Sequence, residues 1–152
     1  MRSYVFEAVS VATGSMAPTL FVGGHYFVNR LAYRFHPPRR GDIIVFTSPV
    51  DHETGLIKRV IAVQGDQIEI RGKKVILNGG AIEEPYAVYK RANVTLDGDY
   101  LGPLRVPDGK VFVLGDDRDE SSDSSVWKDP RTGERIPFVS VESIKGKLIQ
   151  LI

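Results

Sequence analysis

Residues 56–77 read LIKRVIAVQGDQIEIRGKKVIL, and this stretch indicates a protein built from short β-strands. Its first eight residues are apolar around one Lys-Arg pair, which favours a buried strand that ends at Gly65-Asp66. Residues 67–71 and 74–77 flank Gly72-Lys73 in the pattern of a β-hairpin. A buried strand that runs into a hairpin predicts an antiparallel β fold.

Further strand candidates lie on both sides of this stretch. They are residues 3–12, 25–28, 43–46, 111–114 and 145–152, which are rich in apolar, β-branched and aromatic side chains. Residues 80–110 are more polar and contain several Pro and Gly residues, so we expect an insertion or cap there. One short helix is expected, around residues 20–24 or 140–144. The prediction is therefore a single, mainly β domain over residues 1–152, made of coiled antiparallel sheets or a partial barrel with little helix.

The composition excludes several classes of protein. The 152 residues suffice for one domain with its own hydrophobic core. Twenty Lys and Arg residues against 19 Asp and Glu residues give a net charge of +1, so the charge indicates no nucleic-acid partner. Cysteine is absent, which excludes disulfides, a thiolate nucleophile and thiolate metal sites. No run of about 18 apolar residues is present, so we do not expect this chain to span a membrane by itself.

The first candidate for chemistry is the segment from Thr13 to Leu20. Ser15 follows Gly14 at the end of a predicted strand, where a turn can expose its hydroxyl and its backbone N–H. The hydroxyl of Thr13 would be a second donor beside that N–H, and two converging donors can form an oxyanion hole. The alternative is an ordinary Gly-Ser turn that begins a helix, with Pro18 in the first turn.

The second candidate is Lys58. Because side chains alternate along a strand, either Lys58 or its neighbour Arg59 must lie on an aliphatic face. A lysine removed from water has a lowered pKa, and its neutral amine can act as a general base, whereas arginine stays protonated. The alternative is a surface lysine on an edge strand whose ammonium group reaches the solvent.

The third candidate is the polar loop of residues 115–125, which contains five acidic residues, one arginine and several serines. It lacks the Gly and Glu spacing of an EF-hand, so we expect no metal there. It could instead be a solvated loop, or a scaffold that orients catalytic groups. The scattered residues His25, His36 and His52 support neither a zinc site nor a histidine triad, so a serine hydrolase here would need Lys58 as its base.

Four segments, taken in order, resemble the motifs of the type I signal peptidases, membrane-bound serine proteases that remove signal peptides from exported proteins. They are SMAPTL at 15–20, RGDIIVF at 40–46, KRVIAVQGD at 58–66 and GDDRDESSDS at 115–124. Any one motif is moderately specific, whereas four in the same order over nearly the whole chain are strongly so. The resemblance implies a bacterial serine endopeptidase without a cofactor, in the coiled β fold that signal peptidases share with repressor-type proteases.

The resemblance also implies roles for individual residues. Ser15 is expected to be the nucleophile and Lys58 the general base, with the Ser15 N–H and the Thr13 hydroxyl as the oxyanion hole. Ser121 is expected to hydrogen-bond and orient Lys58. Two more roles are structural: Asp116 would pair with Arg59, and Asp123 would lie near the site.

The chain departs from the family pattern in its fourth motif. Asp117 and Glu120 stand where asparagine is common, and Ser125 stands where arginine is frequent. Asp123 is therefore expected to lack its usual partner, and Arg118 or a water molecule would compensate. The membrane helix that precedes the nucleophile in the family is not in this sequence, so we expect an excised catalytic domain with Met1 as an added start.

The implied substrates are signal peptides that end in a small-x-small motif such as Ala-x-Ala. Such a peptide would bind as an extended strand between the nucleophile and lysine strands. The expected pocket walls, which could equally be ordinary core residues, are Val9, Val11, Met16, Leu20, Leu56 and Ile57. An apolar rim near Tyr4, Phe6 and Phe21 would meet the membrane surface, which places the enzyme at the cell membrane on its extracytoplasmic side.

Two alternative functions remain open on the sequence. A self-cleaving repressor-type protease would use the same Ser-Lys chemistry, but it should carry an Ala-Gly or Cys-Gly cleavage pair before the serine, and this chain has none. A non-catalytic β-rich binding module would keep Ser15 and Lys58 apart.

Overall fold

A computed structural model describes residues 6–149, and its strands pair antiparallel throughout. The strands are β1 (Phe6–Ser10), β2 (His25–Asn29), β3 (Ile43–Thr47), β4 (Gly55–Val63), β5 (Gln67–Arg71), β6 (Lys74–Leu77), β7 (Gly80–Ala81), β8 (Tyr100–Arg105), β9 (Lys110–Leu114), β10 (Val139–Ser140) and β11 (Ile144–Ile149). Within the described residues, helical structure is confined to the short 3₁₀ turns η1 (Asp97–Asp99), η2 (Arg118–Glu120) and η3 (Val141–Ser143).

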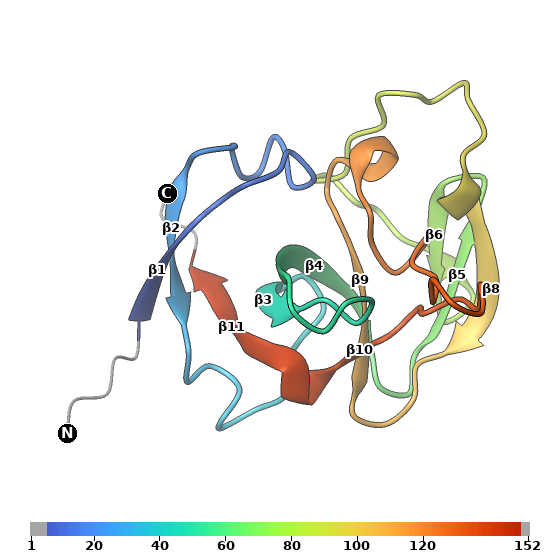
Figure 1. Ribbon diagram of the computed structural model, residues 1–152. Coiled ribbons are helices and arrows are strands. Elements are labelled where there is room, and N and C mark those ends of the chain that lie inside the picture. Colours follow the sequence, from blue (N-terminus) through green and yellow to red (C-terminus); the bar gives the residue numbers. More distant parts are fainter. Residues whose placement is uncertain (1–5, 150–152) are drawn as a thin grey trace.

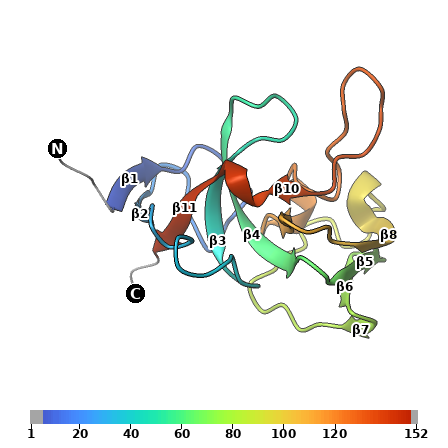
Figure 2. The same cartoon turned by 90° about the horizontal axis from the view of Figure 1, so that it is seen from below.

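Two sheets form the fold. The larger has the strand order β1-β2-β11-β3-β4-β9-β10, and the smaller has the order β7-β6-β5-β8. The larger sheet is strongly curled, with β1, β2 and β11 curving around β3 and β4 (Figure 1). The smaller sheet lies beyond β9, at the opposite end of the molecule from β1, in both views (Figure 2).

The strand β4 connects the two hydrophobic cores on either side of it. Val60 packs with Ile44, Phe46 and Trp127 in one core, and Ile61 packs with the apolar side chains of the smaller sheet in another. Both faces of its C-terminal half are therefore buried, which explains why residues 60–63 are an unbroken apolar run. A third core, beside the segment that contains Ser15, includes Met16, Leu20 and Val11.

The predicted mainly β, antiparallel fold is confirmed, although several local expectations are not. The strand expected at residues 3–12 ends at Ser10, and its residues 3–5 lie outside the described residues, as do 150–152 of the last strand. A helix at 20–24 was wrong, because the chain turns at Gly23 (φ 81°) directly into β2. The alternative at 140–144 corresponds to η3.

Part of the segment expected to be a loose cap is regular. Residues 100–105 form β8, which pairs with β5, and only the preceding stretch crosses the molecule as irregular chain. Gly102 has a φ of 78° and lies at a shift in the pairing register, so the strand carries a bulge and lacks the regular alternation that identifies strands in a sequence.

The pairing of β4 leaves one of its edges open. On one side, β3 pairs with β4 from Gly55 to Arg59, but on the other side β9 pairs with it only from Arg59 to Val63. The N-terminal half of β4 therefore has a free edge within the described chain. Because β1 is also an edge strand of the described sheet, two unpaired strand edges flank the segment that contains Ser15.

Candidate active site

A small cleft of about 90 Å³ contains both of the residues expected to carry the chemistry. One wall is the chain that follows β1, and the other is the N-terminal half of β4. The lining residues are Ser10, Val11, Ala12, Thr13, Ser15, Met16, Gly55, Leu56, Ile57 and Lys58. Residues separated by more than forty positions in the sequence thus face the same space.

Ser15 is held in a tight turn between β1 and β2. The N–H of Ala17 donates to the Gly14 carbonyl at 3.0 Å, and the buried side chain of Met16 fixes the turn in the core. The Ser15 carbonyl accepts a hydrogen bond from the N–H of Asp117 at 2.8 Å. The Ser15 hydroxyl oxygen lies 3.2 Å from the hydroxyl oxygen of Thr13, which brings together two of the predicted site residues.

Lys58 is a buried lysine without a carboxylate in direct contact. Its side chain leaves β4 beside the cleft, the residue is only 3% exposed, and Nζ donates a hydrogen bond to Ser121 Oγ at 3.0 Å. Burial lowers the pKa of Lys58 to about 8, although the nearby carboxylate of Asp123 acts in the opposite direction. Among the described hydrogen bonds, the Ser15 hydroxyl contacts Thr13 and not Lys58, so the two groups share the cleft without a direct hydrogen bond.

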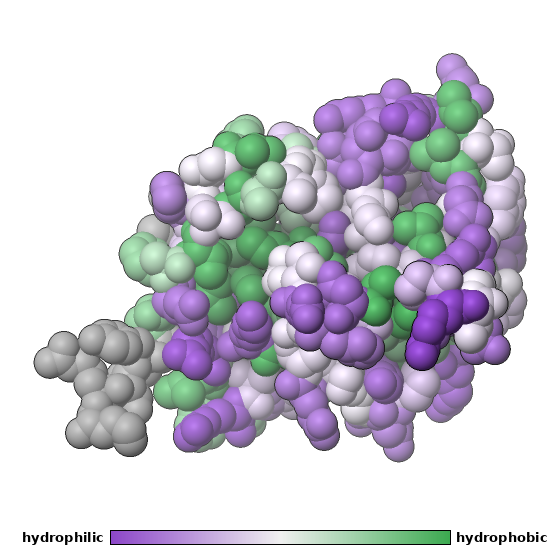
Figure 3. All heavy atoms as spheres, in the orientation of Figure 1, coloured by the Kyte–Doolittle hydropathy of each residue, from purple (hydrophilic) through white to green (hydrophobic). Residues whose placement is uncertain are grey.

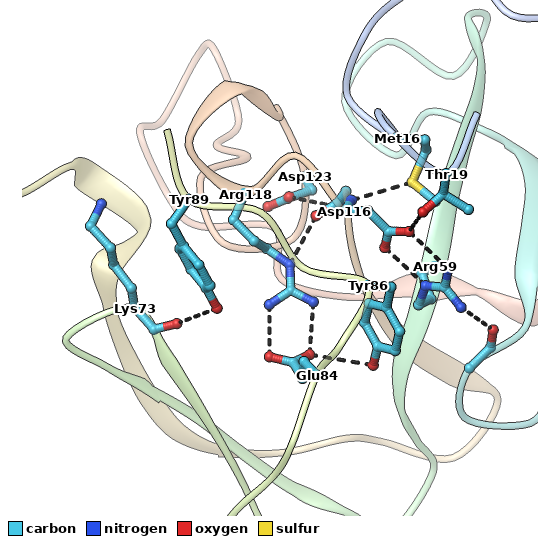
Figure 4. A network of polar contacts seen from close by, with 12 residues as sticks. Met16, Thr19, Arg59, Lys73, Glu84, Tyr86, Tyr89, Asp116, Arg118 and Asp123 are labelled. Carbon is cyan, nitrogen blue, oxygen red and sulfur yellow. Dashed lines mark hydrogen bonds and ion pairs between the residues drawn. The ribbon is translucent and has the colours of Figure 1, made fainter. Parts of the chain in front are cut away.

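A buried ion pair joins β4 to the acidic loop directly behind the cleft. Arg59 donates from Nε and Nη2 to the two carboxylate oxygens of Asp116, both at 2.8 Å, and Asp116 is fully buried (Figure 4). Thr19 donates its hydroxyl proton to the same carboxylate at 2.6 Å, and the Asp116 N–H points at the sulfur of Met16. The pair therefore fixes the turn that contains Ser15 and β4 at the same point.

Asp123 occupies a buried position with neutral partners. Its carboxylate accepts hydrogen bonds from the N–H of Gly115 at 3.0 Å and from the N–H and hydroxyl of Ser125 at 3.0 and 2.6 Å. The Ser125 side chain thus satisfies the carboxylate where arginine is frequent in the family. Arg118, the expected substitute, instead forms a paired contact with Glu84 at 2.8 and 2.7 Å (Figure 4).

The additional acids of the loop have their own cations. Lys90 of the cap binds Asp117 at 2.7 Å, and Arg91 binds Glu120 at 2.9 Å. Asp117 nevertheless keeps one carboxylate oxygen, Oδ1, that is buried and has no hydrogen-bond partner. The two positions where asparagine is common in the family are therefore balanced by charges from residues 90 and 91.

The six expected pocket residues fall into two groups. Val11, Met16, Leu56 and Ile57 line the cleft, whereas Val9 and Leu20 pack into the third hydrophobic core without lining it.

Several contacts that hold the site together were not predictable from the sequence. Thr19 and Glu84 each bind a residue of the acidic loop, and the ring of Tyr86 lies 3.9 Å from the guanidinium carbon of Arg59 (Figure 4). Glu84 and Tyr86 belong to the cap, which no motif connects with the loop. One sequence signal for close packing at the site was available. Gly115 stands immediately before two acids, and a glycine there indicates that neighbouring residues, here Ser15 and Ser121, contact the backbone closely.

Two negative observations apply to residues 6–149. They contain no group of three or more His, Cys, Asp or Glu side chains arranged to bind a metal ion. They also contain no helix with the length and apolar character needed to cross a bilayer.

Comparison with known proteins gives consistent matches. Residues 1–151 match the family described as signal peptidase, peptidase S26. Signal peptidase I of Leptolyngbya laminosa is 38% identical and probable signal peptidase I-1 of Synechocystis is 39% identical, each over 84% of this chain. The chain spans 63% of the length of the first relative and 65% of the second.

Two further matches come from Bacillus and Enterococcus. Signal peptidase I of Bacillus caldolyticus is 37% identical over 97% of this chain and 80% of its own length. Among solved structures, a signal peptidase I of Enterococcus faecalis V583 matches with a TM-score of 0.55 and 31% identity, over 74% of this chain and 97% of that chain.

Proposed function

The chain belongs to the signal peptidase family, peptidase S26, and we propose that it is a serine endopeptidase that removes N-terminal signal peptides from exported preproteins. The resemblance of the four sequence motifs is thereby confirmed at the level of the family. The observation that carries the proposal is that Ser15, Thr13 and a buried Lys58 line one cleft.

In the proposed reaction Ser15 is the nucleophile and Lys58 is the general base. A pKa of about 8 leaves about a tenth of the Lys58 side chains uncharged at pH 7, which supplies a base at that pH. Ser121 holds the Lys58 amine at 3.0 Å and thereby limits the positions it can occupy. When substrate is bound, the Ser15 hydroxyl turns from Thr13 toward the Lys58 amine.

The reaction then proceeds in two steps. The Ser15 oxygen bonds to the scissile carbonyl carbon while its proton passes to the Lys58 amine. The Ser15 N–H and the Thr13 hydroxyl stabilise the resulting oxyanion. The C–N bond breaks as the Lys58 ammonium returns the proton to the departing amine. Water then attacks the acyl-Ser15 ester, giving one proton to Lys58, and the ester bond breaks as that proton returns to Ser15.

We infer that the substrate binds as an added β-strand. The free edge of Gly55–Lys58 and the outer edge of β1 both offer unpaired backbone groups to an extended peptide. The cleft is small, at about 90 Å³, which suits the short side chains of a small-x-small motif such as Ala-x-Ala. The proposed pocket walls are the four expected residues that line the cleft, Val11, Met16, Leu56 and Ile57, whereas Val9 and Leu20 support them from the third hydrophobic core.

The membrane surface is the second proposed partner. Four large apolar side chains near the nucleophile segment are about half exposed or more: Phe6, Phe21, Val22 and Phe27. Hydrophobic side chains gather on the side of the molecule formed by β1 and β2, whereas the loops at the opposite end are largely hydrophilic (Figure 3). We propose that this apolar side meets the outer face of the cell membrane. Tyr4, also expected at this rim, lies outside the described residues.

The test uses two variants and one control. Ser15→Ala and Lys58→Ala should each lower kcat/KM for an Ala-x-Ala signal-peptide substrate on the order of a thousandfold or more, with an unchanged melting temperature. Lys74→Ala, which removes an exposed lysine on β6, should keep the wild-type rate. Normal cleavage by either site variant would disprove the Ser-Lys pair. Binding of the peptide without any cleavage by the wild type would favour a binding module.

A further inference from the structure

A second hollow, of about 340 Å³, adjoins the cleft. It lies between the loop that joins β3 to β4 and the chain that follows Ser121, two segments that project on the same side of the molecule (Figure 2). Leu56 lines both the hollow and the cleft, so the two spaces are neighbours. Ser122 also lines the hollow, and the residue before it holds the Lys58 amine. The hollow therefore opens beside the proposed base.

The direction of the proposed reaction decides which part of a substrate reaches this hollow. Residues before the cleaved bond lie along β1 and the free edge of β4. The departing amine receives its proton from Lys58, so the first residue after the cleaved bond lies at the Lys58 amine. The next substrate residues then pass Ser121, which binds the Lys58 amine, and reach Ser122 at the edge of the hollow. This reasoning rests on the function proposed above and assigns the hollow to the opposite side of the cleaved bond from the small pockets.

We propose that the hollow is a subsite for the first residues of the mature protein, those that follow the cleaved bond, and that it favours a basic over an acidic side chain there. Its floor is apolar, made by the half-buried Val126 and the buried Trp127. The aliphatic stem of a lysine or arginine can lie on such a floor while its charged end remains at the rim.

The charges at the rim of the hollow decide whether a basic or an acidic substrate side chain is favoured. Asp51 is exposed at the rim, its pKa is lowered to about 2 by hydrogen bonds from Thr54 and Glu53, and the described residues provide it with no ion-pair partner. Lys128 is the cation of the rim, and its amine lies 3.3 Å from the carboxylate of Asp97, which the guanidinium of Arg135 also approaches at 3.7 Å. On the side of the hollow formed by the β3–β4 loop the charge is therefore negative, from Asp51, and it attracts a basic side chain and repels an acidic one placed there.

Three peptides test the proposal, and all share one Ala-x-Ala sequence before the cleaved bond. The first ends one residue after that bond. The other two continue for five residues and carry Lys or Glu at the second position. For the wild-type chain we expect kcat/KM to be on the order of tenfold higher for the long Lys peptide than for the short one. We expect a preference for Lys over Glu of about threefold.

Two variants with matched controls locate these effects. Asp51→Asn should reduce the Lys preference to near one, whereas Glu53→Gln, which removes an exposed acid of the same loop that does not line the hollow, should keep it. Ser122→Trp should fill the hollow and bring the ratio of long to short peptide close to one. Glu53→Trp introduces the same bulk outside the hollow and should leave that ratio unchanged.

The outcomes separate this proposal from the proposed function. Equal cleavage of short and long peptides by the wild type, a Lys preference that survives in Asp51→Asn, or a length ratio that survives in Ser122→Trp would each overturn the subsite while leaving the protease intact. Failure of the wild type to cleave any of the three peptides would instead contradict the proposed function, and the subsite would fall with it.

Discussion

Gly115 should be a glycine for steric reasons alone, and replacing it with alanine should damage catalysis more than folding. The residue directly follows β9, and its φ is not in the left-handed region, so alanine can adopt its backbone conformation. A Cβ atom at this position would lie 2.6 Å from the Ser15 carbonyl oxygen and 2.6 Å from Ser121 Cβ, and it would also overlap the Ser121 hydroxyl. The added methyl group therefore presses on both sides of the proposed Ser-Lys pair.

The size of the effect follows from these contacts. Real Cβ atoms essentially never come closer than 3.0 Å to such neighbours. The Ser15 carbonyl oxygen and Ser121 Cβ must therefore each move away from the new Cβ by at least about 0.4 Å. Overpacking of this kind costs about 1–3 kcal/mol of stability. A misplacement of about 1 Å in a catalytic arrangement costs about a hundredfold in rate, so we expect kcat to fall between about tenfold and a hundredfold.

Steady-state cleavage of an Ala-x-Ala peptide, together with thermal unfolding, measures both effects. KM should change little, because the three atoms nearest to the new methyl group belong to Ser121 and Ser15 and not to the pocket walls on β4. Gly80→Ala is the matched control, since its Cβ would approach nothing closer than 3.9 Å, and it should cleave normally. A Gly115→Ala chain with wild-type kcat would show that Ser121 and the Ser15 carbonyl do not need the positions described.

Three further predictions concern the same site. Because Lys58 must be uncharged, kcat/KM should rise about tenfold per pH unit below pH 7 and level off above pH 9. A profile that is flat from pH 6 to 9 would exclude a lysine base with a pKa of about 8. Ser121→Ala should lower kcat with little change in melting temperature, whereas wild-type turnover would remove this hydroxyl from the site. Asp116→Ala leaves the Arg59 guanidinium buried without its partner, so chemical denaturation should show a loss of about 3–5 kcal/mol in unfolding free energy. Arg71→Ala, which breaks an exposed ion pair, should change that free energy far less, and equal losses in the two variants would argue against the buried pair.

The fold was predictable wherever the strand pattern is local. Residues 43–46 and 56–63 are short apolar runs with β-branched side chains, and both form strands that are largely buried. β8 was not predictable, because Gly102 and the bulge beside it break the alternation that identifies a strand. A short helix was expected around 20–24 or 140–144, but at the first place Gly23 and Gly24 turn the chain into β2 instead.

The site was predictable as residue types and only partly as contacts. The order of the four motifs pointed to Ser15, Lys58 and Ser121 as candidates, yet the partners that hold them are far away in the sequence. Thr19 and Asp116 are 97 positions apart, and their hydrogen bond depends on how β9 returns over the nucleophile turn. Likewise, Arg118 binds Glu84 rather than Asp123. Which carboxylate lies within reach of a guanidinium depends on the three-dimensional fold, and no local sequence pattern specifies it.

The acidic loop after β9 has a consequence for how the protein avoids damaging itself and its neighbours. On the proposed mechanism, hydrolysis requires residues 115–121 to bind both the nucleophile turn and the lysine strand, and these segments are synthesised long before that loop. A chain still emerging from the ribosome, or one that is only partly folded, contains the serine and the lysine but has nothing to fix either. Proteolytic capacity therefore arises only in the finished structure, which gives the enzyme the protection that many proteases obtain from a removable pro-segment.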